Sequence, residues 1–483
     1  MVHGVLIEKG PEDWQILQQK NGYACIYLDG VYRNTSEDPV HCEVFARVVL
    51  EDSGDAVCHW KKCESVEGDE SKGKWKVILE NIPAGGLYRI ETCLHKDNED
   101  LEWSSRGDMI HHLGVGDIYV IAGQSNSAGY GKDQIYDPSE LGVHILRNSG
   151  KWDLASHPFN ESTNTCHEIN METANPGHSP YLSFAKMLKR HLNHPIGLIQ
   201  TALGGSPLSD WNPEENGHLY KNMIKIVREQ GNSVSGILWY QGCSDASSKI
   251  CSNTYLERFE CMVKNIRTDL MNEQLPIFTV QLNRYIGPGD MDLDRSWGML
   301  REAQRQAARQ MSHVYIVPSN DCTLSDAIHI SALSNMKLGE RLARLALHKI
   351  YGKNIFCQAP DIECAYYYGN KEIVLEFGNI YQKLFTFDDS VKELPFTIED
   401  EKGFVKIKGY ELKGPDKFIL KMERAPQGKT LIHGAFEKNP KFFLPMDFAT
   451  HLSMLSFYGV ELKRDIKTDS KSLYECEKKF RKL

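Results

Sequence analysis

The chain has no excess of basic residues and no long hydrophobic run. Its 56 Lys and Arg are outnumbered by 65 Asp and Glu, which gives a formal net charge of −9. Proteins whose main partner is a nucleic acid or an anionic membrane usually present a basic surface, so this balance argues against both partners. No segment is apolar for long enough to span a bilayer, and the first residues, MVHGVLIEKGPEDW, lack the apolar core of a signal peptide.

The cysteines also lack the close spacing of a metal-binding or redox motif. The 13 cysteines are scattered and odd in number, and no two have the Cys-x-x-Cys spacing of a zinc site or a redox motif. Thiols in a reducing compartment stay free and pack as small hydrophobic groups. We therefore expect a cytoplasmic protein without a zinc site.

What the chain does have is the composition of a soluble globular protein, with 41% hydrophobic and 25% charged residues. Its 483 residues exceed the ~250–300 residues to which single cores usually grow, so two or three domains are expected. The patterning changes twice along the chain. We predict a β-sandwich-like domain over residues 1–111, an α/β domain over residues 112–353 and a β-rich domain over residues 354–483.

Both outer domains are predicted from short alternating or apolar runs, which turn-forming residues separate. In the first domain, the absence of any long helix-period segment among these runs favours a small β-sandwich. The runs cover residues 24–28, 42–50, 75–79 and 88–92 in the first domain, and residues 372–377, 404–407, 417–421 and 430–433 in the last.

The middle domain alternates apolar strands with amphipathic helices, which is the pattern of a parallel sheet covered by helices on both faces. The predicted strands are residues 118–122, 143–146, 196–200, 236–240, 277–281 and 314–317. The predicted helices are residues 181–192, 219–226, 297–307 and 338–345. Functional sites on such sheets lie beyond the carboxyl ends of the strands.

The stretch DIYVIAGQSNSAG, residues 117–129, joins the first of these strands to a short helix. Gly123 and Gln124 end the strand, and Ser125 follows, where backbone N–H groups at a helix start point toward a ligand. An attacking hydroxyl and the oxyanion that it creates both benefit from that position. The alternative is that Ser125 or Asn126 only caps the helix.

Small, polar and titratable residues also follow the other predicted strands. They occupy positions 202–206, 241–245, 283–285 and 326–329. The carboxyl ends of parallel strands meet at one edge of the sheet, so these residues are expected to gather there. A purely structural sheet does not need this bias, which therefore favours a catalytic role for Ser125.

A serine hydroxyl becomes a good nucleophile when a base takes its proton, and the usual base is a histidine oriented by a carboxylate. Asp326 and His329 stand three positions apart, so one tight turn would bring the carboxylate to one ring nitrogen and leave the other for Ser125. We predict that the N–H groups of Ser125, Gly205 and the Gln241 carboxamide bind the oxyanion. Alternatively, Gly205 serves only a tight turn and Gln241 is an ordinary polar strand end.

Four blocks of the middle domain follow one another as those of the SGNH-hydrolase superfamily do. They read GQSNSAG at 123–129, LGGSPLSDW at 203–211, WYQGCSDA at 239–246 and DAIHIS at 326–331. The chain most resembles the branch of carbohydrate esterases that holds sialate O-acetylesterases and acetylxylan-esterase-like enzymes. This resemblance implies a flavodoxin-like three-layer α/β/α core, with Ser125 as nucleophile, His329 as base and Asp326 as its orienter.

The resemblance also implies a metal-free serine esterase that needs no cofactor and removes acetyl groups from sugars. The expected substrate is an O-acetylated sialic acid, with an acetylated xylo- or manno-oligosaccharide as the alternative. We expect Gln124, Asn126 and Trp211 to contact the sugar. The family usually has Glu after Gln-Gly in the third block, where this chain has Cys243, so Asp245 would replace that Glu or the site works without it.

Two other functions remain open. The same three side chains could hydrolyse a lipid ester or a thioester, or an inactive hydrolase core could serve a carbohydrate-binding protein. An inactive core has no need to keep Ser125, Asp326 and His329 together, so their presence argues for the enzyme.

Overall fold

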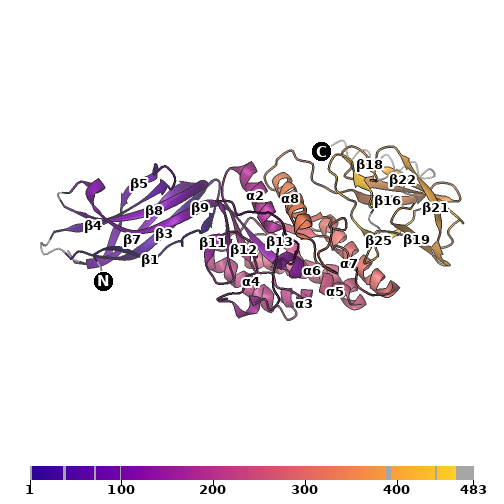
Figure 1. The fold of residues 1–483 in the computed structure, drawn as a ribbon, viewed down its shortest axis with the longest axis horizontal. Helices are drawn as coiled ribbons and strands as arrows, with labels where there is room; N and C mark the ends of the chain where they lie inside the picture. Colours follow the sequence, from indigo (N-terminus) through magenta and orange to yellow (C-terminus); the bar gives the residue numbers. More distant parts are fainter. Residues whose placement is uncertain are drawn as a thin grey trace.

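The computed structural model describes residues 3–35, 40–69, 72–97, 99–387, 393–440 and 443–463. Three regions follow one another along the long axis of the molecule, and each has its own cluster of buried hydrophobic side chains (Figure 1). A β-rich region lies at either end, and helices surround the sheet of the middle region (Figure 1). The mixed α/β class that the patterning predicts is confirmed.

The N-terminal region consists of two antiparallel arrays of strands that share one core. The first array holds β1 (Gly4–Lys9), β3 (Tyr23–Arg33), β7 (Lys72–Pro83) and β6 (Glu64–Gly68). The second holds β5 (Ala56–Lys62), β4 (Cys42–Leu50), β8 (Gly85–Lys96) and the start of β9 (Ser105–Gly123). Leu28 and Trp75 of the first array and Val48 and Ile90 of the second are all buried in the same cluster. Alternate side chains of each strand therefore face a common interior, as the runs predict.

Strand β9 connects this region to the middle of the molecule without a break. Its first half pairs antiparallel with β8, and its second half lies between β12 (Ile196–Gln200) and β13 (Gly236–Tyr240), parallel to both. Strand β2 (Ile16–Gln18) pairs with it near the midpoint. Positions 111 and 112, between which we place a domain boundary, both lie within β9.

The central sheet has the order β11-β10-β12-β9-β13-β14-β15. The strands not yet given bounds are β10 (Val143–Leu146), β11 (Trp152–Leu154), β14 (Ile277–Val280) and β15 (Val314–Val317). All neighbours are parallel except the pair β10 and β11. The chain builds one side of β9 with β10 and β12 and the other side with β13 to β15. Because the strand order reverses at β9, a crevice is expected beyond its carboxyl end.

The longer helices of the middle region pack in pairs. Helix α2 (Tyr181–Leu192) lies against α8 (Ala332–Lys349), and α6 (Lys249–Asp269) lies against α7 (Met291–Gln310). The amphipathic patterns in the sequence predict α2, α7, α8 and also α4 (His218–Glu229), but they do not include α6. Its buried face consists of Ser252 followed by apolar residues that keep the spacing of a helix, from Tyr255 to Ile266. Among the described residues, no helix combines the length and the apolar character needed to cross a membrane.

The remaining helical segments of the described residues are one turn or little more. They are η1 (Leu101–Trp103), α1 (Ser125–Ala128), η2 (Glu168–Asn170), α3 (Leu208–Trp211) and α5 (Cys243–Ala246). Three of them, α1, α3 and α5, directly follow strands of the central sheet or the short loops after those strands. The polar blocks seen in the sequence therefore lie at one edge of the sheet.

The C-terminal region is again built of antiparallel strands. One sheet has the order β16 (Asp361–Tyr367), β17 (Glu372–Gly378), β22 (Lys417–Met422), β21 (Ile407–Lys413). A second has the order β20 (Gly403–Val405), β19 (Phe396–Asp400), β23 (Leu431–Gly434), β25 (Phe457–Glu461), and β18 (Leu384–Phe385) pairs with β24 (Met446–Asp447). Residues 464–483 of the predicted C-terminal domain lie outside the described residues.

A buried arginine fastens the C-terminal region to the middle one. The guanidinium of Arg301, on α7, donates to the carbonyl oxygens of Leu282 and Asn283 and also to that of Glu437. The side chain is fully buried. One residue thus satisfies carbonyl groups of both regions at the foot of the loop that follows β14.

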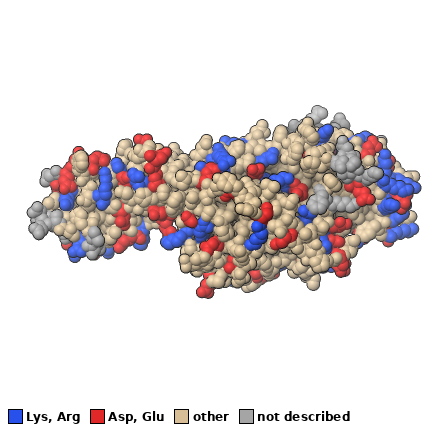
Figure 2. Space-filling view, in the orientation of Figure 1, with Lys and Arg blue, Asp and Glu red and all other residues tan. Residues whose placement is uncertain are grey.

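Charges of both signs mix over the visible surface (Figure 2), and the cysteines of the described residues form no disulfide. On the face that Figure 2 shows, acidic and basic side chains are interspersed over all three regions. The twelve cysteines within the described ranges are all free thiols. The cytoplasmic location stays a prediction.

Candidate active site

The turn after β9 brings Ser125 to the edge of the sheet. Gly123 has φ +117°, and a Cβ at this position would lie 2.4 Å from the carbonyl oxygen of Tyr240 on β13. Only glycine fits so close an approach in that conformation. The next N–H, that of Gln124, donates to the same carbonyl at 3.0 Å. The chain then turns sharply, and Ser125 becomes the first residue of α1.

The hydroxyl of Ser125 points to an imidazole rather than capping α1. Its Oγ lies 2.9 Å from Nε2 of His329, and Nδ1 of His329 lies 2.6 Å from Oδ2 of Asp326. Ser125 and His329 are separated by 204 positions in the sequence. The structure therefore brings the three side chains together in one hydrogen-bonded line at the carboxyl end of β9.

The carboxylate of Asp326 is held by its own turn. Its Oδ1 accepts the backbone N–H groups of Ile328 at 2.8 Å and His329 at 2.7 Å. Partial burial alone would raise the pKa of the Asp326 carboxyl. The two backbone bonds and the imidazole outweigh burial, so the pKa lies below its ordinary value. The group is thus an anion at neutral pH, and an anion there selects the tautomer of His329 that leaves Nε2 free to accept a proton.

Asn126 holds the loop that carries the histidine. Its Oδ1 accepts the N–H of Ile330 at 3.0 Å, and its Nδ2 donates to the carbonyl of Ile328 at 3.2 Å. Asn283 donates to the same carbonyl at 2.6 Å. The Asn126 side chain is 2% exposed. The structure therefore places this residue, which we predict to contact the sugar, beneath the loop of His329.

Gln124 and Trp211 also lie in the interior. Oε1 of Gln124 accepts the N–H groups of Gly242 at 3.0 Å and Ser244 at 3.3 Å, so it joins the first block to the third. Trp211 is fully buried, and its indole N–H donates to Ser206 Oγ at 3.0 Å. The structure does not bring these two predicted sugar contacts to the surface of the site.

Two of the three predicted oxyanion donors, Ser125 and Gly205, follow neighbouring strands of the central sheet, β9 and β12. Ser125 starts α1, so its N–H is among those at the helix start that have no partner within the helix. Gly205 follows β12, has φ +71°, and faces open space, because a Cβ there would meet no atom within 4 Å. The N–H of its neighbour Gly204 donates to a carboxylate oxygen of Glu172 at 2.9 Å. Gly205 therefore presents bare backbone in the loop after β12, at the carboxyl end of the sheet.

The third predicted donor, Gln241, is already fully engaged. Its Nε2 donates to Asp245 Oδ2 at 2.6 Å and to the carbonyl of Ser206 at 3.2 Å, and its Oε1 accepts the hydroxyl of Tyr255 at 3.0 Å. The side chain is fully buried. Gln241 could donate to an oxyanion only by giving up one of these bonds.

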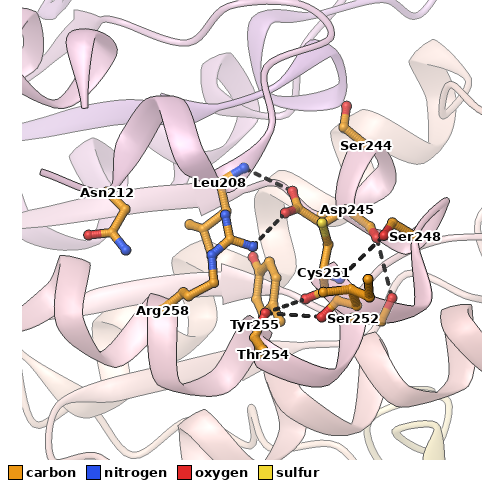
Figure 3. A network of polar contacts seen from close by, with 12 residues as sticks. Leu208, Asn212, Ser244, Asp245, Ser248, Cys251, Ser252, Thr254, Tyr255 and Arg258 are labelled. Carbon is orange, nitrogen blue, oxygen red and sulfur yellow. Dashed lines mark hydrogen bonds and ion pairs between the residues drawn. The ribbon is translucent and has the colours of Figure 1, made fainter. Parts of the chain in front are cut away.

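Asp245 is the centre of a buried network that ties the second and third blocks to α6 (Figure 3). Its carboxylate accepts the backbone N–H of Leu208 at 2.8 Å and Nη1 of Arg258 at 3.1 Å, in addition to Gln241. Arg258 in turn forms a two-bond pair with Glu215 at 2.7 and 2.9 Å. Every oxygen of the Asp245 carboxylate has a protein donor, so its role here is structural.

Cys243, which stands where the resembling family has Glu, offers no replacement acid. The thiol is buried at the start of α5. Burial is the main cause that raises the pKa of Cys243 to about 12. At neutral pH the thiol is uncharged and stays protonated. Position 243 therefore supplies no acidic group to Ser125, His329 and Asp326.

A cluster near the site has ligands of the type that hold metal ions. Among the described residues, the group formed by Asp137, His157 and His178 has its ligand atoms within 4.8 Å of one another. However, Nζ of Lys186 lies 2.6 Å from Asp137 Oδ1, while the two Nε2 atoms lie 3.3 and 3.0 Å from Oδ2. The carboxylate is therefore satisfied by three side-chain donors, and an added cation would be repelled by the ammonium group.

Sequence reasoning missed Tyr130, which lies against His329, and Glu172, which lies beside Tyr130. The ring of Tyr130 stacks on the imidazole, with the centroids 4.8 Å apart. Its hydroxyl lies beside the carboxylate of Glu172, in the irregular segment between β11 and α2. Tyr130 directly follows the GQSNSAG block, which is the one signal that could have found it. Glu172 lies in no pattern that distinguishes it from other surface acids.

The central parallel sheet carries a hydrogen-bonded Ser-His-Asp line at one edge, an arrangement that can make a serine hydroxyl nucleophilic. A family profile described as carbohydrate esterase, sialic acid-specific acetylesterase, matches residues 115–348. A probable carbohydrate esterase from Arabidopsis thaliana is 31% identical over 253 residues, which is 48% of this chain and 90% of that protein. The chain belongs to this family of carbohydrate esterases.

The fold of the whole chain has a counterpart among solved structures. A carbohydrate acetylesterase from Xanthomonas citri superposes with a TM-score of 0.62 at 20% identity, covering 92% of this chain and 97% of that one. This likeness concerns the fold, and it extends over the outer β regions as well as the middle one. The family predicted from the four sequence blocks is confirmed.

Proposed function

We propose that the protein is a serine esterase that removes acetyl groups from sugars through an acetyl-serine intermediate. The observation that carries this proposal is the line from Asp326 through His329 to Ser125, with bonds of 2.6 and 2.9 Å. The family description and the name of the Xanthomonas citri structure support an acetyl group on a carbohydrate. We further propose an O-acetylated sialic acid as the substrate, in keeping with the family description.

The geometry suits each step of acyl transfer. Ser125 Oγ attacks the acetyl carbonyl while its proton passes to His329 Nε2, and the anion of Asp326 stabilises the imidazolium. The carbonyl oxygen becomes an oxyanion, which the N–H groups of Ser125 and Gly205 bind. The imidazolium then gives its proton to the departing sugar oxygen. Water, deprotonated by the same nitrogen, attacks the acetyl-serine, and the imidazolium returns a proton to Ser125 Oγ as acetate leaves.

The proposal includes the architecture around the site. We assign residues 112–353 to a three-layer α/β/α core of the SGNH type. The pairs α2 with α8 and α6 with α7 would form its two helical layers. Residues 1–111 and 354–463 would frame this core as β domains. The continuity of β9 and the buried Arg301 support a rigid attachment of both.

The test is acetate release from a panel of O-acetylated sialic acids, xylo-oligosaccharides and manno-oligosaccharides. We expect the highest kcat/KM with a sialic acid and complete loss of turnover in Ser125→Ala. Ser127→Ala is the matched control, because this hydroxyl of the same helix points into the core and donates to the carbonyl of Ala122. Preference for long acyl chains would favour a lipid or thioester substrate. Failure of a fluorophosphonate to label Ser125 would favour a binding protein.

A further inference from the structure

The ring of Tyr130 covers one face of the His329 imidazole. Its ring is 9% exposed and stacks on His329, with 29° between the two planes. A flat ring packed on the imidazole limits its rotation and so helps to keep Nε2 aimed at Ser125. The position of the Tyr130 ring therefore affects the geometry of the proton transfer.

The hydroxyl of Tyr130 lies beside the carboxylate of Glu172. Burial and then this carboxylate raise the pKa of Tyr130 above its ordinary value, so the hydroxyl keeps its proton. Glu172 is itself anchored, because its Oε2 accepts Nδ2 of the fully buried Asn160 at 3.2 Å. The carboxylate is therefore a fixed point and not a mobile surface acid.

The same carboxylate holds the loop that carries the exposed backbone of Gly205. Oε2 of Glu172 accepts the N–H of Gly204 at 2.9 Å. A Cβ on Gly204 would lie 2.7 Å from this oxygen and 2.8 Å from the hydroxyl of Tyr130. The peptide, the carboxylate and the phenol thus converge at one point.

We infer that Glu172 is a positioning residue, which keeps the loop of Gly205 and the imidazole of His329 in a fixed arrangement relative to each other. Through Gly204 it fixes the N–H of Gly205, which follows β12, and through Tyr130 it fixes His329, which follows β15. These two strands lie on opposite sides of β9, so the register between their loops depends on contacts that cross the site. The inference rests on the proposed function, because it is in that reaction that Gly205 and His329 act.

Glu172→Ala removes the shared acceptor. A displacement of about 1 Å at a catalytic group can cost about 100-fold in rate, so we expect kcat for 4-nitrophenyl acetate to fall roughly 10- to 100-fold. KM should stay within about twofold, because the affected contacts form with the transition state. Glu172→Gln keeps a carbonyl acceptor for Gly204 and should recover most of the lost kcat.

Tyr130→Phe keeps the stacked ring and removes the hydroxyl. We expect kcat to fall about three- to tenfold, the size expected for the loss of one polar contact. In the double variant of Glu172→Ala with Tyr130→Phe, the loss should be no larger than for Glu172→Ala alone, because the carboxylate beside the hydroxyl is already gone. This variant also tests the inference if Glu172→Ala proves too unstable to assay.

Glu168→Ala is the matched control, since this exposed glutamate lies on the same segment, within η2. Unfolding midpoints and the activity of Ser125→Ala are measured in the same series. Wild-type kcat in Glu172→Ala, strictly additive losses, or an effect on KM or unfolding alone would overturn the positioning role and leave the proposed function intact. Unchanged hydrolysis by Ser125→Ala would overturn both.

Discussion

Two polar clusters lie at the same edge of the central sheet, and they use their polar atoms in different ways. Around Gln241 and Asp245, each carboxamide and carboxylate atom is bound to another protein group and removed from water. Around Asp326 and His329, the carboxylate is about half exposed and the imidazole ends on the hydroxyl of Ser125. The saturated cluster shapes the site, whereas the open cluster is free to react.

The largest effect should come from removing the base of the open cluster. His329→Ala takes away the group that accepts the Ser125 proton, and we expect kcat to fall about 10⁴-fold or more. The unfolding midpoint should stay near that of the wild type, because the lost contacts lie at the edge of the site. Acetate release and thermal unfolding are the measurements. A modest loss of activity with a large loss of stability would reverse the comparison.

Removing the centre of the saturated cluster should give the opposite pattern. Asp245→Ala leaves the guanidinium of Arg258 and the N–H groups of Leu208 and Gln241 without their acceptor. Breaking one partner out of a buried ion pair typically costs about 3–5 kcal/mol of unfolding free energy. Urea unfolding of Asp245→Ala measures this cost. Glu215→Ala, which removes the more exposed partner of Arg258, is the control and should cost less.

The pH dependence of stability tests the charge of the Asp326 carboxylate in the open cluster. The pKa of Asp326 is lower in the folded protein than its ordinary value, so its contribution is present above the ordinary pKa and is lost as the pH falls through the folded one. Because the carboxylate is half exposed, we expect this contribution to be below about 1 kcal/mol. Urea unfolding at pH 7 and at pH 3 should therefore show a smaller difference for Asp326→Asn than for the wild type. An equal difference would show that the folded turn does not favour the anion.

The smallest effect on activity is expected at Cys243. A buried thiol that is neutral at pH 7 neither donates nor accepts a proton in the reaction. We expect Cys243→Ala to keep kcat within about threefold, at a small cost in stability from the lost packing. A loss of more than tenfold in kcat, with unchanged unfolding, would assign the thiol a chemical role after all.

Periodicity predicts most of the central region because burial in a parallel sheet leaves a strong local pattern. Strands β10, β12, β13 and β15 have the predicted bounds, and β14 ends one residue early. The pairing of Asp326 with His329 is also local, since one tight turn produces it. Helix α6 is not predicted, although Tyr255, Phe259 and Met262 on its buried face have the spacing of a helix.

Whether a polar side chain is open or saturated is not local, and the sequence alone does not decide it. Gln241 is engaged by Tyr255 and by Ser206, which lie 14 and 35 positions away. Asn126 faces a loop about 200 positions further along. These partners become known only when the chain is folded, so residues adjacent to Ser125 in the motif can be predicted as sugar contacts and still lie beneath the site.

The central claim is that the acyl group passes through the hydroxyl of Ser125. The most direct measurement is peptide mass spectrometry after the enzyme is mixed with 4-nitrophenyl acetate and quenched rapidly in acid. We predict an acetyl group on the peptide that contains Ser125, and its absence when the same experiment uses Ser125→Ala. Acetate release without an acetylated Ser125, together with full activity in the Ser125→Ala variant, would contradict the account.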